Sequence, residues 1–310
     1  MRTAALALLA VSIALPAIAQ NRPSFDCTKA ATAHERTICG NPELAAADRE
    51  MAAAYAALAG RLTGTAKTHL EASQKRWVAD WRGCDGNPQN LAGCLGGRYR
   101  DRTAELKLFA SGPYPFISDH AIIVTGKTYY VDAAYPQFDG TFADFGAVNR
   151  RFAESTRKDV DFFAGSPDGG FEQDFDLARP MPNLISILLR RSWWTAHVVI
   201  SIQGTLIDLG TGRPVGLDAL FLSRHGLDLA IEAVVRKEFA AEGRGDPPAD
   251  LASQIAQLEA AAFIFEADAL TVTLDGIARA IAMKGYTIDI PYADLKGLIR
   301  PDGPLAGKTK

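Results

Sequence analysis

The chain has 310 residues, of which 48% are hydrophobic and 22% are charged, so it can bury sizeable cores. A formal net charge of −3 lacks the basic excess of a nucleic-acid-binding protein, and we expect no nucleic-acid partner. The length suits two domains. Residues 20–110 carry 13 Lys/Arg and 10 Asp/Glu, whereas residues 111–310 carry 19 and 26, which indicates two domains with different surfaces.

The N-terminus predicts export. Met1 and Arg2 precede an apolar stretch, Thr3 to Leu15, and Ala17-Ile18-Ala19 has the small-residue pattern of a signal-peptide cleavage site. We therefore predict a signal peptide over residues 1–19, cleavage near Ala19, and a periplasmic or secreted protein. A membrane anchor needs about 20 apolar residues. No later segment meets that length, so we expect no transmembrane segment in the mature chain.

Four cysteines lie in the first third of the chain: Cys27, Cys39, Cys84 and Cys94. In an exported protein an even, clustered set predicts disulfides. Three pairings are possible, and the short spacings favour Cys27–Cys39 and Cys84–Cys94, each contributing about 3 kcal/mol in the chain-entropy model. A zinc site would need closely spaced cysteine pairs, which are missing, so we expect no metal.

Residues 20–110 are predicted to form an all-helical domain. Asn41-Pro42-Glu43 is a helix start, since Asn can cap and Pro suits the first position. The stripe that follows ends near Gly60, a second helix ends at Gly83, and a third continues to about residue 109. The apolar positions at helical spacing are Leu44, Ala47, Met51, Tyr55 and Leu58, then Leu70, Trp77 and Trp81, then Leu91, Leu95, Tyr99, Leu106 and Phe109.

Residues 111–115, with two prolines and a glycine, are predicted to be a linker. Residues 116–310 mix strands and helices without a regular βαβ repeat, so the predicted fold class is α+β, in this domain and overall. The predicted strands are 121–124, 127–135, 184–189, 194–209, 262–274 and 286–290. The predicted helices are 142–163, 227–241, 249–260 and 292–299.

The common catalytic motifs are missing: there is no GxSxG, HExxH or phosphate-binding glycine loop, and no two of the five histidines stand four residues apart. We therefore predict a protein that is not an enzyme and needs no cofactor. Near Gly169-Gly170, an acidic stretch lacks the spacing of a calcium loop and is interpreted as a solvated loop. Its acidic residues are Asp168, Glu172, Asp174 and Asp176.

Several aromatic and basic residues have two interpretations. Trp77 and Trp81 could stack on a sugar, but their helical spacing favours a place in the core. Trp193-Trp194 lies in a predicted strand, so the two rings should point to opposite faces. Arg98 and Arg102, one helical turn apart near Asp101 and Glu105, are interpreted as a solvated, ion-paired face.

The helical domain resembles the LprI-like lysozyme inhibitors over about residues 24–109. The resemblance rests on Phe25-Asp26-Cys27, Glu35 to Cys39, Asn41 to Leu44, Asp48-Arg49-Glu50, Tyr55, Gln74, Trp77, Arg82, Cys84, Cys94, Tyr99, Arg102 and Glu105-Leu106. It implies a small disulfide-bonded helical module of the cell envelope, with lysozyme as the expected partner.

The second domain is similar to the extracytoplasmic domain of RsiV-type anti-sigma factors and PdaC-type peptidoglycan deacetylases. The residues that carry this likeness are Asp208 to Val215, Leu217 to Phe221, Ala269 to Val272, Gly285 to Tyr292 and Leu295. RsiV-type proteins bind lysozyme, so both halves imply one class of partner. Residues 275–280, Asp-Gly-Ile-Ala-Arg-Ala, depart from the aromatic-rich turn of that family.

The leading hypothesis is an exported periplasmic protein that binds or inhibits lysozyme; the sequence leaves its contact residues unknown. The alternative is a non-catalytic cell-wall module that binds peptidoglycan or another peptidoglycan-active protein. An enzyme of unrecognised type is a third reading, which would require a cleft with paired titratable residues.

Overall fold

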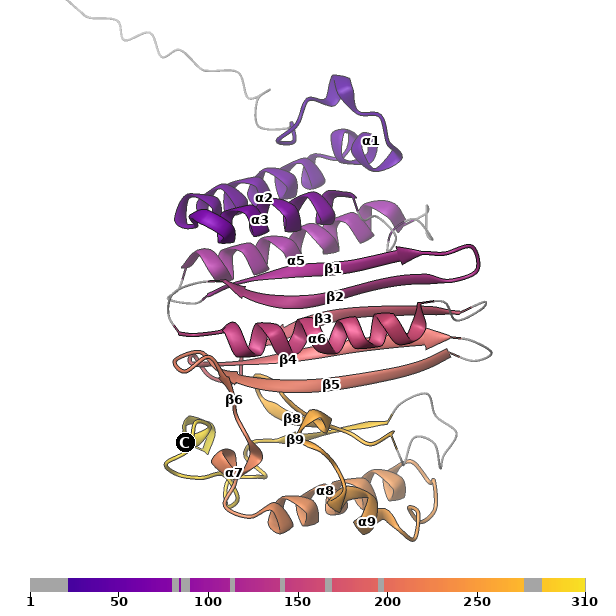
Figure 1. Ribbon diagram of the computed structural model, residues 1–310, viewed down its shortest axis with the longest axis vertical. Coiled ribbons are helices and arrows are strands. Elements are labelled where there is room, and N and C mark those ends of the chain that lie inside the picture. The colour runs from indigo at the N-terminus through magenta and orange to yellow at the C-terminus, as the bar shows by residue number, and fades with distance from the viewer. Residues whose placement is uncertain are drawn as a thin grey trace, which may run out of the picture. The chain divides into compact units, whose positions relative to one another are not determined.

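The computed structural model describes residues 22–79, 84, 90–111, 115–139, 143–164, 169–194, 198–275 and 286–309. Its contacts divide the chain into two compact units. The described residues up to Ser111 form the helical unit, and those from Pro115 onward form the sheet unit (Figure 1). The predicted α+β class, with a disulfide-bonded helical N-terminal part, is confirmed.

The helical unit begins with a short 3₁₀ turn and continues with helices whose ends follow local capping rules. Thr32 and Glu35 form a reciprocal capping box before the first helix, and Asn41 caps the second by accepting from the N–H groups of Glu43 and Leu44. The elements are η2 (Cys27–Lys29), α1 (Ala33–Gly40), α2 (Pro42–Arg61), α3 (Gly64–Ala79) and α5 (Leu91–Ser111).

The core of the helical unit lies where α2 and α5 pack together, with α1 and α3 against them. The predicted stripes are largely buried, although Ala47, Tyr55, Trp77 and Leu91 are only partly covered. Trp81 and Gly83, which were placed in the second helix, lie outside the described residues. The large buried apolar side chains are Ile38, Leu44, Met51, Leu58, Leu70, Leu95, Tyr99, Leu106 and Phe109.

The sheet unit contains a six-stranded sheet in the order β1-β2-β3-β4-β5-β6, antiparallel except for the parallel pair β2 and β3. Helix α6 (Gly146–Phe163) joins that parallel pair and lies across one face of the sheet (Figure 1). The strands are β1 (Phe116–Thr125), β2 (Tyr130–Asp139), β3 (Gly170–Ala178), β4 (Leu184–Trp194), β5 (Val198–Asp208) and β6 (Arg213–Pro214).

A second sheet and three helices complete this unit. The sheet has three antiparallel strands, β7 (Phe263–Phe265), β8 (Ala269–Thr273) and β9 (Thr287–Pro291). The helices are α7 (Leu217–Leu220), α8 (Arg224–Ala241) and α9 (Leu251–Ala256), and two short 3₁₀ turns are η4 (Ala260–Ala262) and η5 (Ala306–Thr309). The second sheet and α8 share a large apolar core, to which Ile231, Val235, Phe263, Leu270 and Ile288 contribute.

Three predictions about the second domain were wrong. The stretch 262–274 is not one strand, because the chain turns back after Phe265 and β7 pairs antiparallel with β8. The acidic stretch is not a solvated loop, because residues from Gly170 onward form β3. There Phe171 and Gln173 are buried and alternate with exposed Glu172 and Asp174, the period of a strand with one covered face. Residues 292–299 form successive turns rather than a helix, with hydrogen bonds that mostly span three residues and a β-bridge from Ile299 to Phe221.

Candidate interaction site in the helical unit

Two disulfides hold the helical unit. Of the three possible ways to pair the four cysteines, the structure has the predicted local one. Cys27 is bonded to Cys39, which ties η2 to α1, and Cys84 is bonded to Cys94 on α5. Both loops are short, with sequence separations of 12 and 10 residues. A unit of this size has a modest core, so these bonds are a substantial part of its stability.

A buried carboxylate joins the two central helices. Asp48 on α2 is only 4% exposed, and its Oδ1 accepts a 2.9 Å hydrogen bond from the Tyr99 hydroxyl on α5. Its other oxygen accepts from the backbone N–H of Ser24. Burial and then the Asp48 charge raise the pKa of Tyr99, so its hydroxyl stays protonated and continues to donate.

A second polar network surrounds Arg102, which is 6% exposed. Its guanidinium donates to Gln74 Oε1 at 3.2 Å, to Ser73 Oγ at 3.0 Å and to Glu105 Oε2 at 2.7 Å. The interpretation of Arg102 as part of a solvated face was wrong. Its planar fork of donors is held between α3 and α5, where a shorter or unforked side chain could not reach all three acceptors.

Arg98 was also assigned to that solvated face, and it instead packs on α3. Its Nη2 donates to the backbone carbonyl of Trp77 at 3.1 Å, and its guanidinium carbon lies 5.5 Å from the Trp77 ring centroid. The same ring meets Tyr99 edge-on, with 5.4 Å between centroids. Trp77 is thus part of the packing between helices, as its spacing predicted, and the residues that carry the LprI resemblance build the frame of the unit.

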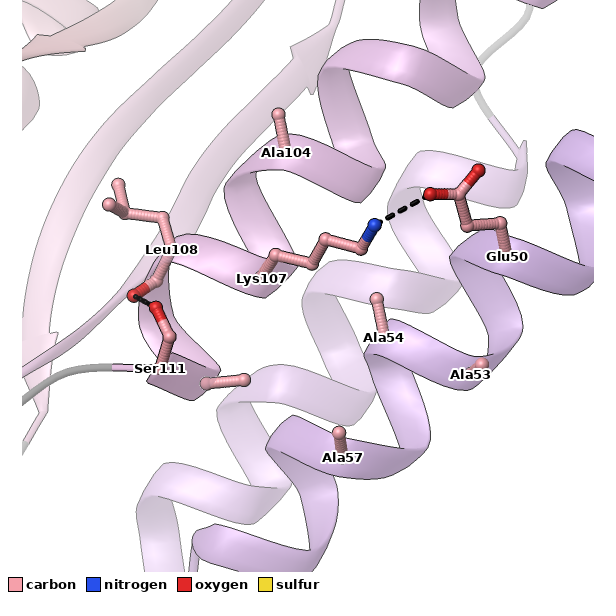
Figure 2. Close-up of a pocket in the computed structure, with 9 residues that line it drawn as sticks. Glu50, Ala53, Ala54, Ala57, Ala104, Lys107, Leu108 and Ser111 are labelled. Carbon is pink, nitrogen blue, oxygen red and sulfur yellow. Dashed lines mark hydrogen bonds and ion pairs between the residues drawn. The ribbon is translucent and has the colours of Figure 1, made fainter.

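A groove of about 660 Å³ opens between α2 and α5 (Figure 2). Its floor and walls are mostly alanine, and because these side chains are short, the space above them is left open. At one end Lys107 Nζ lies 2.6 Å from Glu50 Oε1. The lining residues are Glu50, Ala53, Ala54 and Ala57 on α2 and Ala104, Lys107, Leu108, Ala110 and Ser111 on α5.

The groove is lined mainly by short apolar side chains and by one exposed ion pair. The Lys107–Glu50 pair is exposed on both sides, and such surface pairs contribute at most about 1 kcal/mol, so a ligand can separate them at little cost. Sequence reasoning missed the groove because it followed only the buried stripes. The usable signal was that Ala53 and Ala57 stand one helical turn apart outside the apolar stripe of α2.

Elsewhere among the described residues, no group of three or more His, Cys, Asp or Glu side chains is placed to hold a metal ion. The acidic residues noted near Gly169 do not form one cluster in the described part of the chain. Asp174 and Asp176 on β3 both pair with Arg190 on β4, whereas Asp168 lies outside the described residues. Trp193 and Trp194 end β4 and point to opposite faces: Trp193 packs beside Phe163 of α6, and Trp194 lies over Gly170.

These features define a small, disulfide-bonded helical domain with an open groove, next in the chain to an α+β unit. The model of the family described as "Lysozyme inhibitor LprI" matches residues 27–106. This match and the two formed disulfides indicate an extracytoplasmic location. Within the described part of the chain, every helix is too short or too polar to cross a membrane.

Two solved structures share similarity with the chain. One is a DUF3298 family protein from Pseudomonas aeruginosa PAO1, with 15% identity and a TM-score of 0.46, covering 61% of this chain and 96% of that one. The other is a DUF3298 family member from Bacteroides fragilis NCTC 9343, with 15% identity and a TM-score of 0.43, covering 64% and 98%. A comparison with curated proteins gave no match.

Proposed function

We propose that the chain is an exported protein that binds and inhibits lysozyme through its helical unit. The observation that carries this proposal is the match of residues 27–106 to the lysozyme-inhibitor family. The formed disulfides support it, because such bonds persist in the oxidising spaces where lysozyme acts.

The groove between α2 and α5 is the proposed contact surface. Its alanine walls suit an apolar side chain of lysozyme, and Lys107 at its end offers an ammonium group. Lysozyme cleaves its substrate with two carboxyl groups in an open cleft, so a cation held over that cleft would both occlude it and pair with a carboxylate. Separation from Glu50 would release Lys107 for that contact.

Filling the groove should weaken binding. The Ala57→Trp variant places a large side chain against α5, and we expect at least a tenfold loss of affinity for a c-type lysozyme, about 1.4 kcal/mol. Ala56→Trp is the matched control, because Ala56 is exposed on the same helix but does not line the groove. Calorimetric titration of the full mature chain at low salt measures the affinity of both variants for lysozyme, and circular dichroism shows whether each variant is folded.

The outcomes distinguish whether the chain binds lysozyme from which surface it uses. If the unaltered chain does not bind lysozyme at micromolar concentration, the proposed function is wrong. If it binds and the two tryptophan variants bind equally well, lysozyme contacts another surface. Sedimentation of the chain with purified cell-wall sacculi, without lysozyme, would instead support the peptidoglycan-binding alternative.

The remaining assignments also belong to this proposal. We infer a signal peptide over residues 1–19, an LprI-like helical domain with two disulfides over 20–110, a linker over 111–115, and an RsiV- or PdaC-type domain over 116–310. N-terminal sequencing of the exported protein tests the first of these, with Gln20 expected as the first residue.

A further inference from the structure

Helix α6 has a buried face and an outward face. The buried side chains recur every fourth residue and lie toward the six-stranded sheet, which α6 crosses on one side (Figure 1). They are Val148, Phe152, Thr156 and Val160. The outward face is charged and more basic than acidic. Its exposed acidic residues are Glu154 and Asp161, and its exposed basic residues, called the basic stripe, are Arg150, Arg151, Arg157 and Lys158.

The basic stripe is not neutralised by its neighbours. In the part of the chain that the structure describes, none of its four side chains forms an ion pair. Helix α8 differs, because Arg224 pairs there with Asp228 and Arg236 pairs with Glu232. The stripe is also a local exception, since residues 111–310 carry 19 basic and 26 acidic residues. Its cations are therefore available to an anionic partner.

An exposed phenylalanine lies at the end of the stripe. Phe162 follows Lys158 by one helical turn and is 76% exposed. Its ring meets that of Phe163 edge-on, with 4.9 Å between centroids, and Phe163 stacks on buried Phe171 of β3, also at 4.9 Å. These contacts fix the exposed ring in one orientation. Because burial of such a ring is strongly favourable, Phe162 is suited to insertion into an apolar phase.

A second exposed apolar side chain lies near this ring. Phe163 also packs against Trp193 of β4, with 5.8 Å between ring centroids. Val199 of β5 is directly opposite Trp193 in the strand register, so both side chains lie on the face of the sheet that α6 covers. Val199 is 41% exposed. Phe162 and Val199 thus form an apolar tip at the C-terminal end of the basic stripe.

We propose that the basic stripe and the apolar tip bind the surface of a bilayer that contains anionic lipids. Guanidinium and ammonium groups pair with the headgroup phosphates, and the Phe162 ring enters the boundary between headgroups and acyl chains. The negative potential of such a surface attracts each nearby cation, whereas carboxylates elsewhere in the unit are screened beyond about 8 Å at physiological salt. A soluble polyanion would pair with the cations but leave Phe162 and Val199 in water, which favours the bilayer.

Sedimentation with lipid vesicles tests this proposal in the full mature chain. Vesicles of phosphatidylglycerol and phosphatidylcholine in equal parts are anionic, whereas vesicles of phosphatidylcholine alone carry no net charge. We expect binding to the first and not to the second, and weaker binding as salt rises. Lys158→Glu should weaken binding about tenfold, because it reverses one charge of the stripe. Phe162→Ser should also weaken it about tenfold, because it removes the side chain that inserts.

Each variant has a matched control on α8. Lys237→Glu makes the same charge change at an exposed position, and Leu229→Ser replaces an apolar side chain that is 53% exposed. Helix α8 packs with the second sheet, so neither residue belongs to the outward face of α6. Both controls should bind vesicles as the unaltered chain does, and circular dichroism shows whether all four variants are folded.

Failure of the unaltered chain to bind anionic vesicles at low salt overturns the proposal. The proposal is also wrong if Lys158→Glu and Phe162→Ser bind as tightly as their controls. If only Lys158→Glu weakens binding, and soluble dextran sulfate binds as well as the vesicles do, the partner is an anionic polymer and the bilayer is refuted. The affinity for lysozyme should be unchanged in both α6 variants, so this proposal and the proposed function can fail independently.

Discussion

Reduction of both disulfides is expected to unfold the helical unit and to leave the sheet unit folded. Each bond closes a loop of 10 to 12 residues, and each should contribute about 3 kcal/mol. A domain of this size has a total stability of roughly 5 to 15 kcal/mol, so the loss of both bonds removes a large part of it. The groove, which depends on the packing of α2 against α5, should be lost with it.

The measurement is thermal unfolding followed by circular dichroism, with and without a thiol reductant. The chain supplies its own control, because all four cysteines lie in the helical unit and the sheet unit has none. The midpoint temperature of the helical unit should therefore fall on reduction, while that of the sheet unit is unchanged. Two double variants each remove one disulfide: Cys27→Ser/Cys39→Ser and Cys84→Ser/Cys94→Ser. Each should lower the midpoint temperature of the helical unit by about half as much as reduction of both bonds does. Two transitions that are both unaffected would show that the disulfides do not hold the unit.

Replacing Arg102 by methionine should lower the free energy of unfolding of the helical unit by about 2 to 3 kcal/mol. Methionine fills a similar volume but removes the hydrogen bonds that Arg102 donates to Gln74 and Ser73 and its ion pair with Glu105. The stability of Arg102→Lys should lie between those of the unaltered chain and of Arg102→Met, because lysine keeps the charge but lacks the forked geometry that reaches three acceptors.

Urea unfolding measures this effect, and Arg100→Met is the matched control. Arg100 lies on the same helix and is exposed, so its replacement should change stability by less than about 0.5 kcal/mol. Equal midpoints for the Arg102 and Arg100 variants would mean that Arg102 is solvated after all. The affinity of the folded Arg102 variant for lysozyme should be unchanged, because Arg102 supports the frame and does not line the groove.

These predictions concern residues that carry the family resemblance yet face inward. Asp48, Tyr99 and Arg102 connect helices through buried hydrogen bonds. The proposed lysozyme-binding surface lies elsewhere, on the alanine face of α2 and α5. A match to this family therefore identifies a frame, and the side chains placed around that frame decide what it binds.

Local signals in the sequence were sufficient for the start of α2 and for the core stripes of the helical unit, although they missed α1. Asn41, Pro42 and Glu43 act through capping and the preset proline backbone, which depend on a few adjacent residues, so they predicted the start of α2 correctly. The stripes around Leu58, Leu95 and Leu106 predicted the core, because amphipathic periodicity directly reflects which side of a helix is buried.

Long-range contacts decided the rest. An arginine near two acidic residues has the same sequence pattern in a solvated face and in a buried network, and only the approach of α3 placed Ser73 and Gln74 around Arg102. Strand β3 was obscured by its carboxylates, which are tolerated because that side of the sheet remains open. The spacing of Ala53 and Ala57 marks small side chains on one side of α2, but they line a groove only because α5, distant in sequence, packs beside them.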